Sequence, residues 1–434
     1  WIGTESGLYI YDVSSEQFSF YGQKFNPSEE GLNDKAIYSI FRSRDSIMWI
    51  GTYFGGVNYT DLFNIGFYRI YADGGRSALS GNAVSEIIET SDKKIWIATE
   101  DGGINILNPH EGTFRYFKHI NDDPYSLSSN NVHALEEDRQ GNIWVGTFLG
   151  GLNKYDIKTK TFKTVKLVPP IEEMYHDVYT KSIFSVYIDS KNRIWVGSIG
   201  GLYMREDENE DFKIWNPKFF QNVFVYDINE DQFHNLWICS YEQGVYKIDT
   251  AMNISHYKAG TNHNLLSNRF VFCFTDTSDT IWFGTMEGGL VRYNSKTNEF
   301  RSYTEADGLS NNNVYAIAKD RNNYLWISTN KGISLFDPVS EIFVNYSEND
   351  GLVGNQFNFK SGKMASNGIM YFGAVNGITY FDPQHLRKDN LIPQVHFTSL
   401  RISNIPVQIG NGNILSYHID FQNEISLRYR HKVF

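Results

Sequence analysis

The sequence predicts an all-β protein, and three observations carry that prediction. Variants of the phrase Trp-Ile-Gly-Thr-x-x-Gly-Gly-Leu-x-x-Tyr-Asp recur along the 434 residues. They begin at Trp1, Trp49, Trp96, Trp144, Trp195, Trp237, Trp282, Trp326 and Tyr371, between 42 and 51 residues apart. Each copy sits among short apolar runs separated by turns rich in Gly, Asn and Asp. A repeat of about 40–50 residues built from short strands is typical of a β-propeller, in which each repeat forms one blade.

The repeat around Trp144 shows how one blade is expected to form. Its apolar-rich runs are 132–138, 143–147, 152–156 and 162–165. Turn residues separate these runs, which predicts a four-stranded antiparallel meander with strands A to D in chain order. We expect the Trp of strand B to pack between neighbouring blades, because its ring buries more area than a smaller side chain. The pair Gly150-Gly151 precedes strand C, where a sharp turn needs residues that tolerate positive φ.

The last repeat lacks its own fourth strand, and an earlier segment can replace it. Complete four-strand units surround the six signatures from Trp96 to Trp326, whereas the Tyr371 unit has no ordinary strand D after Asp382. A spare strand pattern lies at 67–71. Because a closed ring leaves no open edge, we predict that 67–71 becomes the fourth strand of the Tyr371 blade. This closes a seven-bladed propeller over residues 66–385; the alternative is a single larger ring that also uses the Trp1 and Trp49 units.

Two further regions flank this propeller. Residues 1–65 are expected to be the last blades of a preceding propeller, and the chain is expected to be cut from a longer protein because Trp1 begins within a blade. From 393 to 434 the blade signature is absent. Alternating apolar residues at 393–402 and 425–429 predict the start of a different, truncated β module.

Composition excludes several classes of function. The chain carries 39 Lys and Arg against 50 Asp and Glu, a net charge of −11, with no basic tract that would bind nucleic acid. No run approaches the roughly 18 apolar residues of a membrane span. Cys239 and Cys273 are expected to be buried apolar residues. We expect no cofactor and no metal site, because no spacing of acidic residues resembles a calcium loop.

Three ordered features resemble the two-component regulator propeller family. They are the repeated Trp-Ile-Gly-Thr phrase, the Leu-Ser-x-Asn-x-Val pattern at 79–84, 127–132 and 309–314, and the phrase Asp-Gly-Leu-x-x-Asn-Gln-Phe-Asn at 350–358. The last phrase looks like the closing repeat of that family. The segment from Pro393 looks like the opening of the Y_Y_Y β-sandwich domain that follows it.

The resemblance implies a role in signal transduction. In that family, two seven-bladed propellers and a Y_Y_Y domain form the periplasmic sensor of hybrid two-component systems, best known in gut Bacteroidetes. The sensor detects oligosaccharides and drives a histidine kinase across the inner membrane to control polysaccharide utilisation. This chain is therefore expected to be a carbohydrate-sensing region and not an enzyme. The full-length sensor is expected to be a homodimer anchored by a transmembrane helix outside this chain.

Loops that depart from the repeat are the expected ligand site. In a propeller the D–A and B–C loops emerge on one face, and repeated residues there serve the scaffold. Loop aromatics suit stacking on sugar rings, and carboxylates bind sugar hydroxyls. The ligand-binding candidates are Glu100, Asp101, Phe148, Tyr175, His176, Tyr179, Trp215, Phe219, Phe220, Tyr241, Glu242, Met286 and Glu287. No catalytic residue is expected among them.

Two alternatives remain open at this point. A protein-interaction platform would use the same loop aromatics and acids to bind a partner protein. A propeller lyase that resembles the streptogramin-inactivating enzymes would need converging acid and base groups on the central face. His133, His176 and His263 lie near that face, but the sequence pairs them in no evident constellation.

Overall fold

The computed structural model describes most of the chain and divides it into two compact units. The described residues are 1–13, 16–24, 31–43, 47–61, 66–75, 78–168, 177–261, 264–275, 279–386, 397–410, 414–422 and 424–427. One unit runs from Trp1 to Arg387 and the other from Lys388 to Phe434. Structural statements below concern the described residues.

Two three-stranded sheets begin the first unit. One has the order β1-β2-β3, from Ile2–Gly3, Leu8–Asp12 and Gln17–Tyr21. The other has the order β4-β5-β6, from Ile37–Arg42, Ile47–Thr52 and Val57–Asp61. Leu8, Leu32 and Ile50 form a small core that the two sheets share. The assignment of this region to a preceding propeller stays a prediction.

Seven further sheets, here blades I to VII, follow in chain order. Blade I contains β8 (Val84–Glu89), β9 (Ile95–Thr99), β10 (Gly103–Asn108) and β11 (Thr113–Phe117). Blade II contains β12 (Val132–Glu137), β13 (Ile143–Thr147), β14 (Gly151–Asp156) and β15 (Thr161–Val165). Blade III contains β17 (Ile183–Ile188), β18 (Ile194–Ser198), β19 (Gly201–Arg205) and β20 (Phe212–Ile214), to which β16 (Leu167–Val168) adds a parallel edge strand. Blade IV contains β21 (Val225–Glu230), β22 (Leu236–Ser240), β23 (Gly244–Ile248) and β24 (Ile254–Tyr257).

The remaining blades repeat the plan. Blade V contains β25 (Phe270–Thr275), β26 (Thr280–Thr285), β27 (Leu290–Asn294) and β28 (Glu299–Tyr303). Blade VI contains β29 (Val314–Lys319), β30 (Leu325–Thr329), β31 (Gly332–Asp337) and β32 (Ile342–Tyr346). Blade VII contains β33 (Phe357–Met364), β34 (Met370–Ala374), β35 (Gly377–Phe381) and β7 (Tyr68–Ile70). Short helices α1 (Asp177–Lys181) and α2 (Pro217–Phe220) interrupt two D–A loops.

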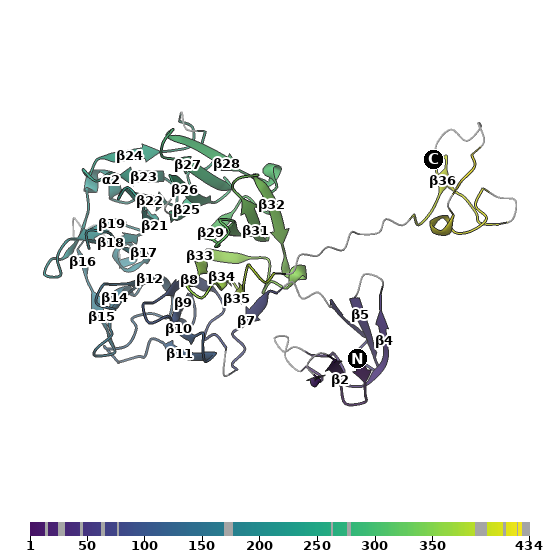
Figure 1. Cartoon of the computed structure of the whole chain (residues 1–434). Helices are drawn as coiled ribbons and strands as arrows, with labels where there is room; N and C mark the ends of the chain where they lie inside the picture. Colours follow the sequence, from purple (N-terminus) through teal and green to yellow (C-terminus); the bar gives the residue numbers. More distant parts are fainter. Residues whose placement is uncertain are drawn as a thin grey trace. The chain divides into compact units, whose positions relative to one another are not determined.

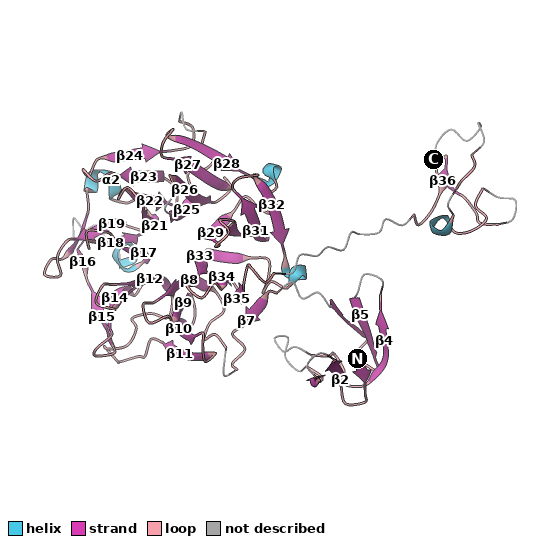
Figure 2. Cartoon of the chain, viewed as in Figure 1, coloured by secondary structure: helices cyan, strands magenta, loops and turns pink. Residues whose placement is uncertain are grey.

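The seven blades form a ring with their A strands at the centre (Figure 1). Each A strand contacts the A strand of the next blade, and β33 of blade VII contacts β8 of blade I. Apart from these strands, this part of the chain consists almost entirely of turns and loops (Figure 2). The all-β propeller predicted from the repeats is therefore the observed fold.

Blade VII is built from two distant segments. β7 pairs antiparallel with β35, with Tyr68 opposite Tyr380 and Ile70 opposite Ile378. Phe67, just before β7, packs against Phe381 and Tyr346. The segment 67–71 thus supplies the outer strand of blade VII, as predicted.

The repeated Trp residues lie between blades. Trp144 of blade II is 1% exposed and packs with Val196, Tyr203 and Phe212 of blade III. Trp237 of blade IV packs in the same way against Phe283 and Tyr293 of blade V. The expected packing of this side chain between neighbouring blades is confirmed.

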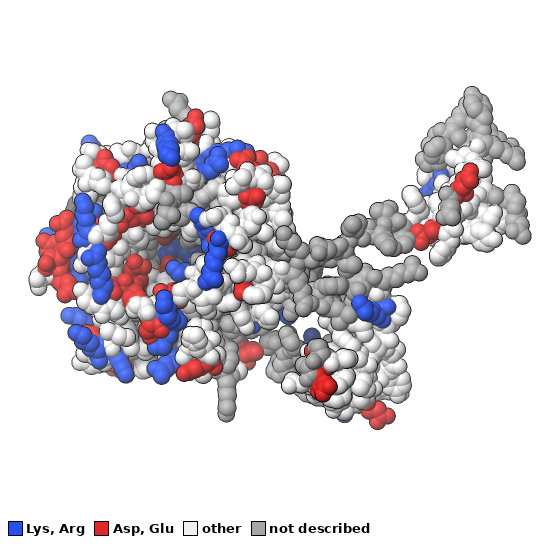
Figure 3. All heavy atoms as spheres, viewed as in Figure 1, with Lys and Arg blue, Asp and Glu red and all other residues white. Residues whose placement is uncertain are grey.

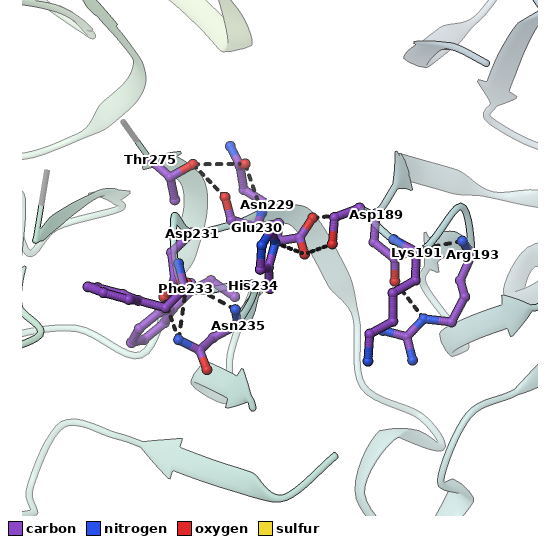
Figure 4. Close-up of polar contacts among 12 residues, drawn as sticks. Asp189, Lys191, Arg193, Asn229, Glu230, Asp231, Phe233, His234, Asn235 and Thr275 are labelled. Carbon is purple, nitrogen blue, oxygen red and sulfur yellow. Dashed lines mark hydrogen bonds and ion pairs between the residues drawn. The ribbon is translucent and has the colours of Figure 1, made fainter. Parts of the chain in front are cut away.

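Residues of the A–B turns form hydrogen bonds with the repeated Trp and with the neighbouring blade. Trp195 Nε1 donates a hydrogen bond of 2.9 Å to Asp189, whose carboxylate also accepts the backbone N–H groups of Lys191 and Arg193. Ser190 in this turn donates through its N–H and Oγ to Glu230 of the next blade, at 2.8 and 2.6 Å. Figure 4 shows the Glu230 carboxylate between the turns that begin at Asp189 and Asp231. Two equivalent Ser–Glu ties join Ser91 to Glu137 and Ser366 to Glu89.

The second unit shows little regular structure in its described residues. β36 (Arg401–Ile402) pairs with β37 (Ile405–Pro406), and Ile419–Phe421 forms one 3-10 turn. Residues 397–400 and 424–427 lie in no strand. The strand expected at 393–402 is present in part, as β36 at Arg401–Ile402, and the described residues of the strand expected at 425–429 form no strand. Residues 393–396 and 428–429 of these expected strands lie outside the described residues. A Y_Y_Y domain stays a prediction.

Truncating an inter-blade Trp should destabilise the ring. We expect Trp144→Ala to lower the free energy of unfolding by about 3–5 kcal/mol, because a fully buried ring leaves a cavity. Trp49→Ala is the matched control, since Trp49 is 39% exposed and should cost less. Urea unfolding of both variants measures the difference, and equal losses would contradict the packing role of Trp144.

The glycine that begins strand C can be tested with a matched pair. Gly289 has φ +77°, and an added Cβ would lie 2.0 Å from the Tyr303 carbonyl oxygen. Gly74 has nearly the same backbone, φ +79°, but an added Cβ would meet nothing within 4 Å. We expect Gly74→Ala to cost about 1–2 kcal/mol for the left-handed backbone alone. Gly289→Ala should cost clearly more in the same denaturant titration; similar costs would show that the clash is absent.

Candidate functional site

The D–A and B–C loops lie on one face of the propeller, here the loop face. In blade II the first residue of β12, Val132, pairs with the last residue of β13, Thr147. The loop before β12 and the loop after β13 therefore emerge at the same end of the sheet. The same register recurs in blade IV, where Val225 pairs with Ser240.

A bulge at the second position of strand A sends one residue of most blades toward the axis. In blade II, Val132 and Ala134 pair with consecutive residues of β13, which leaves His133 as an extra residue. Bulges of this kind are known to redirect a side chain next to functional sites. The equivalent extra residues in the other blades are Ser85, Phe184, Tyr226, Val271 and Tyr315.

Three of these bulged residues form one largely aromatic cluster with several B–C loop residues. Its buried centre is Phe184, Tyr226 and Val271. Around these pack Phe148, Ile199, Phe224, Tyr241, Met286 and Phe359. We call this set the axial aromatic cluster. Blades II to V and blade VII contribute to it.

Ring contacts in the axial aromatic cluster run from blade to blade. The Phe184 ring centroid lies 4.5 Å from that of His133 and 5.3 Å from that of Tyr226. Tyr226 stacks on Tyr241 at 5.9 Å and contacts Phe359 at 5.2 Å. Burial raises the pKa of Tyr226 well above its ordinary value, so its hydroxyl stays protonated.

Blade VII departs from the other blades at the axis. Phe357 pairs with Ala374 and Gly362 with Phe372, so four residues of β33 stand opposite the single residue Gly373 of β34. We call residues 358–361 the axial bulge. Its Asn358 side chain donates a hydrogen bond of 2.8 Å to Glu100 of blade I.

Lys360 of the axial bulge lies in a buried charged centre. Its Nζ donates to the Phe184 carbonyl oxygen at 2.6 Å and lies 3.4 Å from Glu86 and 3.9 Å from Asp227. Both carboxylates also accept a backbone N–H, from Leu135 to Glu86 and from Cys273 to Asp227. The Lys360 side chain is 4% exposed.

Burial governs the protonation of the groups around Lys360. It raises the pKa of Glu86 to about 7 and that of Asp227 to about 6, against the opposing pull of the Lys360 charge. Burial and the neighbouring Glu86 raise the pKa of Glu136 to about 8. Burial, with the Lys360 charge, lowers the pKa of His133 to about 4. These groups therefore change charge at pH values different from those at which exposed side chains of the same types do.

Four of the residues expected at the ligand site meet at or beside the axial aromatic cluster. Phe148, Tyr241 and Met286 pack into the cluster, and Arg269 lies over the Tyr241 ring at 5.7 Å. Glu100 bonds to Asn358 of the axial bulge. These B–C loop residues thus lie together on the loop face, and their part in ligand binding stays a prediction.

Other expected residues lie on the same loops with different surroundings. Asp101 accepts hydrogen bonds from Asn82, and Glu287 pairs with Arg269 at 3.2 Å. Glu242 is exposed, and Tyr179 of α1 is half-buried. Tyr175 and His176 lie outside the described residues, as does His263 of the lyase alternative.

The D–A loop between blades III and IV does not present all its aromatics. Phe220 is fully buried in the core with Trp195, Val225 and Tyr246, so the expectation that its ring is exposed is wrong. α2 turns the ring inward, where it buries apolar area. Trp215 is half-buried against Trp195, whereas Phe219 is 39% exposed.

The bulged A-strand residues Phe184 and Tyr226 and the axial bulge residues Phe359 and Lys360 were not among the predicted ligand-binding residues. The residue after the first apolar position of strand A varies from blade to blade, but so does the residue that follows it. Sequence variation along the repeats therefore does not single out the bulged residues.

Charge and membrane features complete the description. Figure 3 shows acidic side chains around the hollowed centre of the propeller and at its rim. Within the described residues, no group of three or more His, Cys, Asp or Glu side chains is arranged to hold a metal ion. No helix in this part of the chain is long and apolar enough to cross a membrane.

The geometry defines the class of protein: it is a seven-bladed β-propeller with an aromatic site on its axis. Residues 31–54, 126–148 and 308–331 match the family described as two component regulator propeller. In these three segments the chain is similar to that family.

Known relatives are components of signalling systems. A structure described as the extracellular domain of a hybrid two-component system from B. thetaiotaomicron is 26% identical, with a TM-score of 0.74 over 95% of this chain and 55% of its own. Histidine kinase P4 of Formosa agariphila is 26% identical over 64% of this chain and 21% of its own length. The chain thus spans about half, or less, of the length of these relatives. A streptogramin B lyase, 15% identical with a TM-score of 0.55 over 73% of this chain and 98% of its own, shares the fold alone.

The protonation of His133 can be checked directly. Because burial lowers its pKa to about 4, the imidazole should stay neutral from pH 8 down to about pH 5. Its folded-state pKa lies below the unfolded value of 6.5, so His133 lowers the stability of the fold as the pH falls from 6.5 to about 4. An NMR pH titration, with His133→Gln used to assign the ring signal, should give a midpoint near 4. A midpoint near 6.5 would place the ring in water.

Proposed function

We propose that this chain is the extracytoplasmic ligand-sensing region of a hybrid two-component sensor histidine kinase, and that it binds an oligosaccharide on the loop face. The convergence of Phe148, Tyr241 and Met286 with the bulged aromatics of other blades carries the proposal. Aromatic rings stack on the apolar faces of sugars, and nearby carboxylates such as Glu242 accept hydrogen bonds from hydroxyls. The bound glycan would control genes for polysaccharide utilisation.

The similar proteins support the proposal that this chain is a sensor region. A domain of 26% identity is described as extracellular and as part of a hybrid two-component system. By analogy the chain lies in the periplasm, in an inner-membrane protein that reaches the membrane through a helix elsewhere in its sequence. The full-length sensor is proposed to be a homodimer, and this region is proposed to bind no nucleic acid.

Calorimetric titration of the chain with a panel of defined plant and host oligosaccharides tests the proposal. We expect saturable binding of one composition without turnover. Binding of a protein partner with no glycan response would favour an interaction platform instead. Product formation during the titration would favour a lyase-like activity and contradict a sensor role.

One variant pair localises the binding. Tyr241→Ala should weaken oligosaccharide binding by about tenfold, which corresponds to about 1.4 kcal/mol. Tyr324 is a control of the same residue type, 37% exposed, in the A–B turn at the opposite end of blade VI. Tyr324→Ala should leave the affinity unchanged. The measurement is the dissociation constant at equal fractions of folded protein, and equal weakening by both variants would move the site away from the loop face.

A further inference from the structure

The axial bulge connects blade VII with four other blades. Asn358 bonds to Glu100 of blade I, and Lys360 bonds to the Phe184 carbonyl of blade III. The Phe359 ring contacts Tyr226 of blade IV at 5.2 Å and Tyr315 of blade VI at 4.6 Å. A segment of four residues therefore places rings of the axial aromatic cluster from several blades relative to one another.

The backbone of Lys360 shows that its position is imposed by its surroundings. Its φ is +56°, in the left-handed region that long side chains rarely adopt. Such strain persists only where contacts over-determine the conformation. The contacts are those of the ammonium with the Phe184 carbonyl, Glu86 and Asp227.

We propose that Lys360 is the positioning residue of the axial aromatic cluster, and that the protonation of the buried carboxyl groups around it sets how firmly the rings are held. Lys360 touches no ligand in this proposal. It acts through Phe184, whose carbonyl it binds, and through Phe359, its neighbour in the axial bulge. The consequence for ligand affinity rests on the proposed function, whereas the positioning itself does not.

Every element packed around the ammonium contributes to its electrostatics. β8 presents Glu86, β12 presents His133 and Glu136, β21 presents Asp227, and β33 adds Lys363, whose charge acts on Glu136. β17 presents the Phe184 carbonyl. Burial raises the pKa of Cys273 on β25 and of Tyr315 on β29, which keeps both neutral.

The sign of the pH dependence follows from the raised carboxyl pKa values. Glu86, Glu136 and Asp227 have folded-state pKa values of about 7, 8 and 6, above their unfolded values of 4.5, 4.5 and 3.8. The stability from their protonated forms is therefore complete below about pH 4 and is lost as the pH rises toward 8. The Lys360 charge limits this loss, because it favours the ionised forms of Glu86 and Asp227.

Removing the Lys360 ammonium should make the loss of stability with rising pH steeper. We compare Lys360→Met with wild type and with Lys331→Met, which removes the same charge from an exposed B–C loop residue. The Tm difference between Lys360→Met and wild type should widen by about 5 °C between pH 5 and pH 9. For Lys331→Met it should stay constant. The near-ultraviolet circular dichroism of Lys360→Met, without ligand, should weaken as the pH rises, because the rings lose their fixed arrangement.

A merely structural lysine would give a different result. A Tm difference for Lys360→Met that is constant with pH, or a near-ultraviolet spectrum equal to that of wild type at pH 9, would overturn the proposal. If Lys360→Met does not fold, Glu86→Gln replaces it. This isosteric change removes one titrating group and should flatten the fall of Tm with pH; an unchanged slope would overturn the proposal equally.

Measurements without and with ligand distinguish a failure of this inference from a failure of the proposed function. Spectra and melting profiles are measured without oligosaccharide, so they test positioning even if no glycan binds. If the titration panel identifies a ligand, Lys360→Met should lower its affinity more at pH 8 than at pH 6. Affinity that is unchanged at both pH values, with disturbed spectra, would place the ligand away from the axial aromatic cluster and contradict the site of the proposed function.

Discussion

The fold depends on one constraint: each blade has an apolar face that only its neighbour can cover. The Trp of strand B meets this need by packing into the next blade, as Trp144 does with Phe212. The chain of contacts closes because Tyr371 of blade VII packs with Ile97 and Leu107 of blade I. Since the cover is mutual, the stability of a blade is a property of the ring rather than of its own sheet.

The repeat is least regular at the axis of the ring, where the side chains differ from blade to blade. Recurring scaffold residues place seven A strands around the axis, and the side chains that meet there differ from blade to blade. Phe184, Tyr226 and Phe359 meet near the loop face, and Lys360 places a charge among them. Because residues of several blades meet in the axial aromatic cluster, its arrangement depends on the closed ring rather than on one blade.

Much of the fold could be predicted from the sequence because scaffold residues recur. Their period predicts the blades. The incomplete Tyr371 repeat indicates that 67–71, where β7 lies, supplies its missing strand. The placement of Phe148, Tyr241 and Met286 on one face could be predicted because their B–C loops leave the blades at the same end. The bulged aromatics could not, since a strand pattern does not reveal which residue a bulge turns toward the axis. Phe220 was misjudged because sequence does not show that α2 directs its ring into the core.

The pairing of β7 with β35 has a consequence for how the molecule is made. Within the seven-bladed ring, the outer strand of blade VII is synthesised first, and its partner strand β35 is synthesised last. Tyr68 therefore stays unpaired while the rest of this ring is synthesised, and a contact so distant in sequence forms slowly. Ring closure is thus the natural last step of assembly. A polypeptide interrupted before β35 would leave an exposed strand edge available for aggregation.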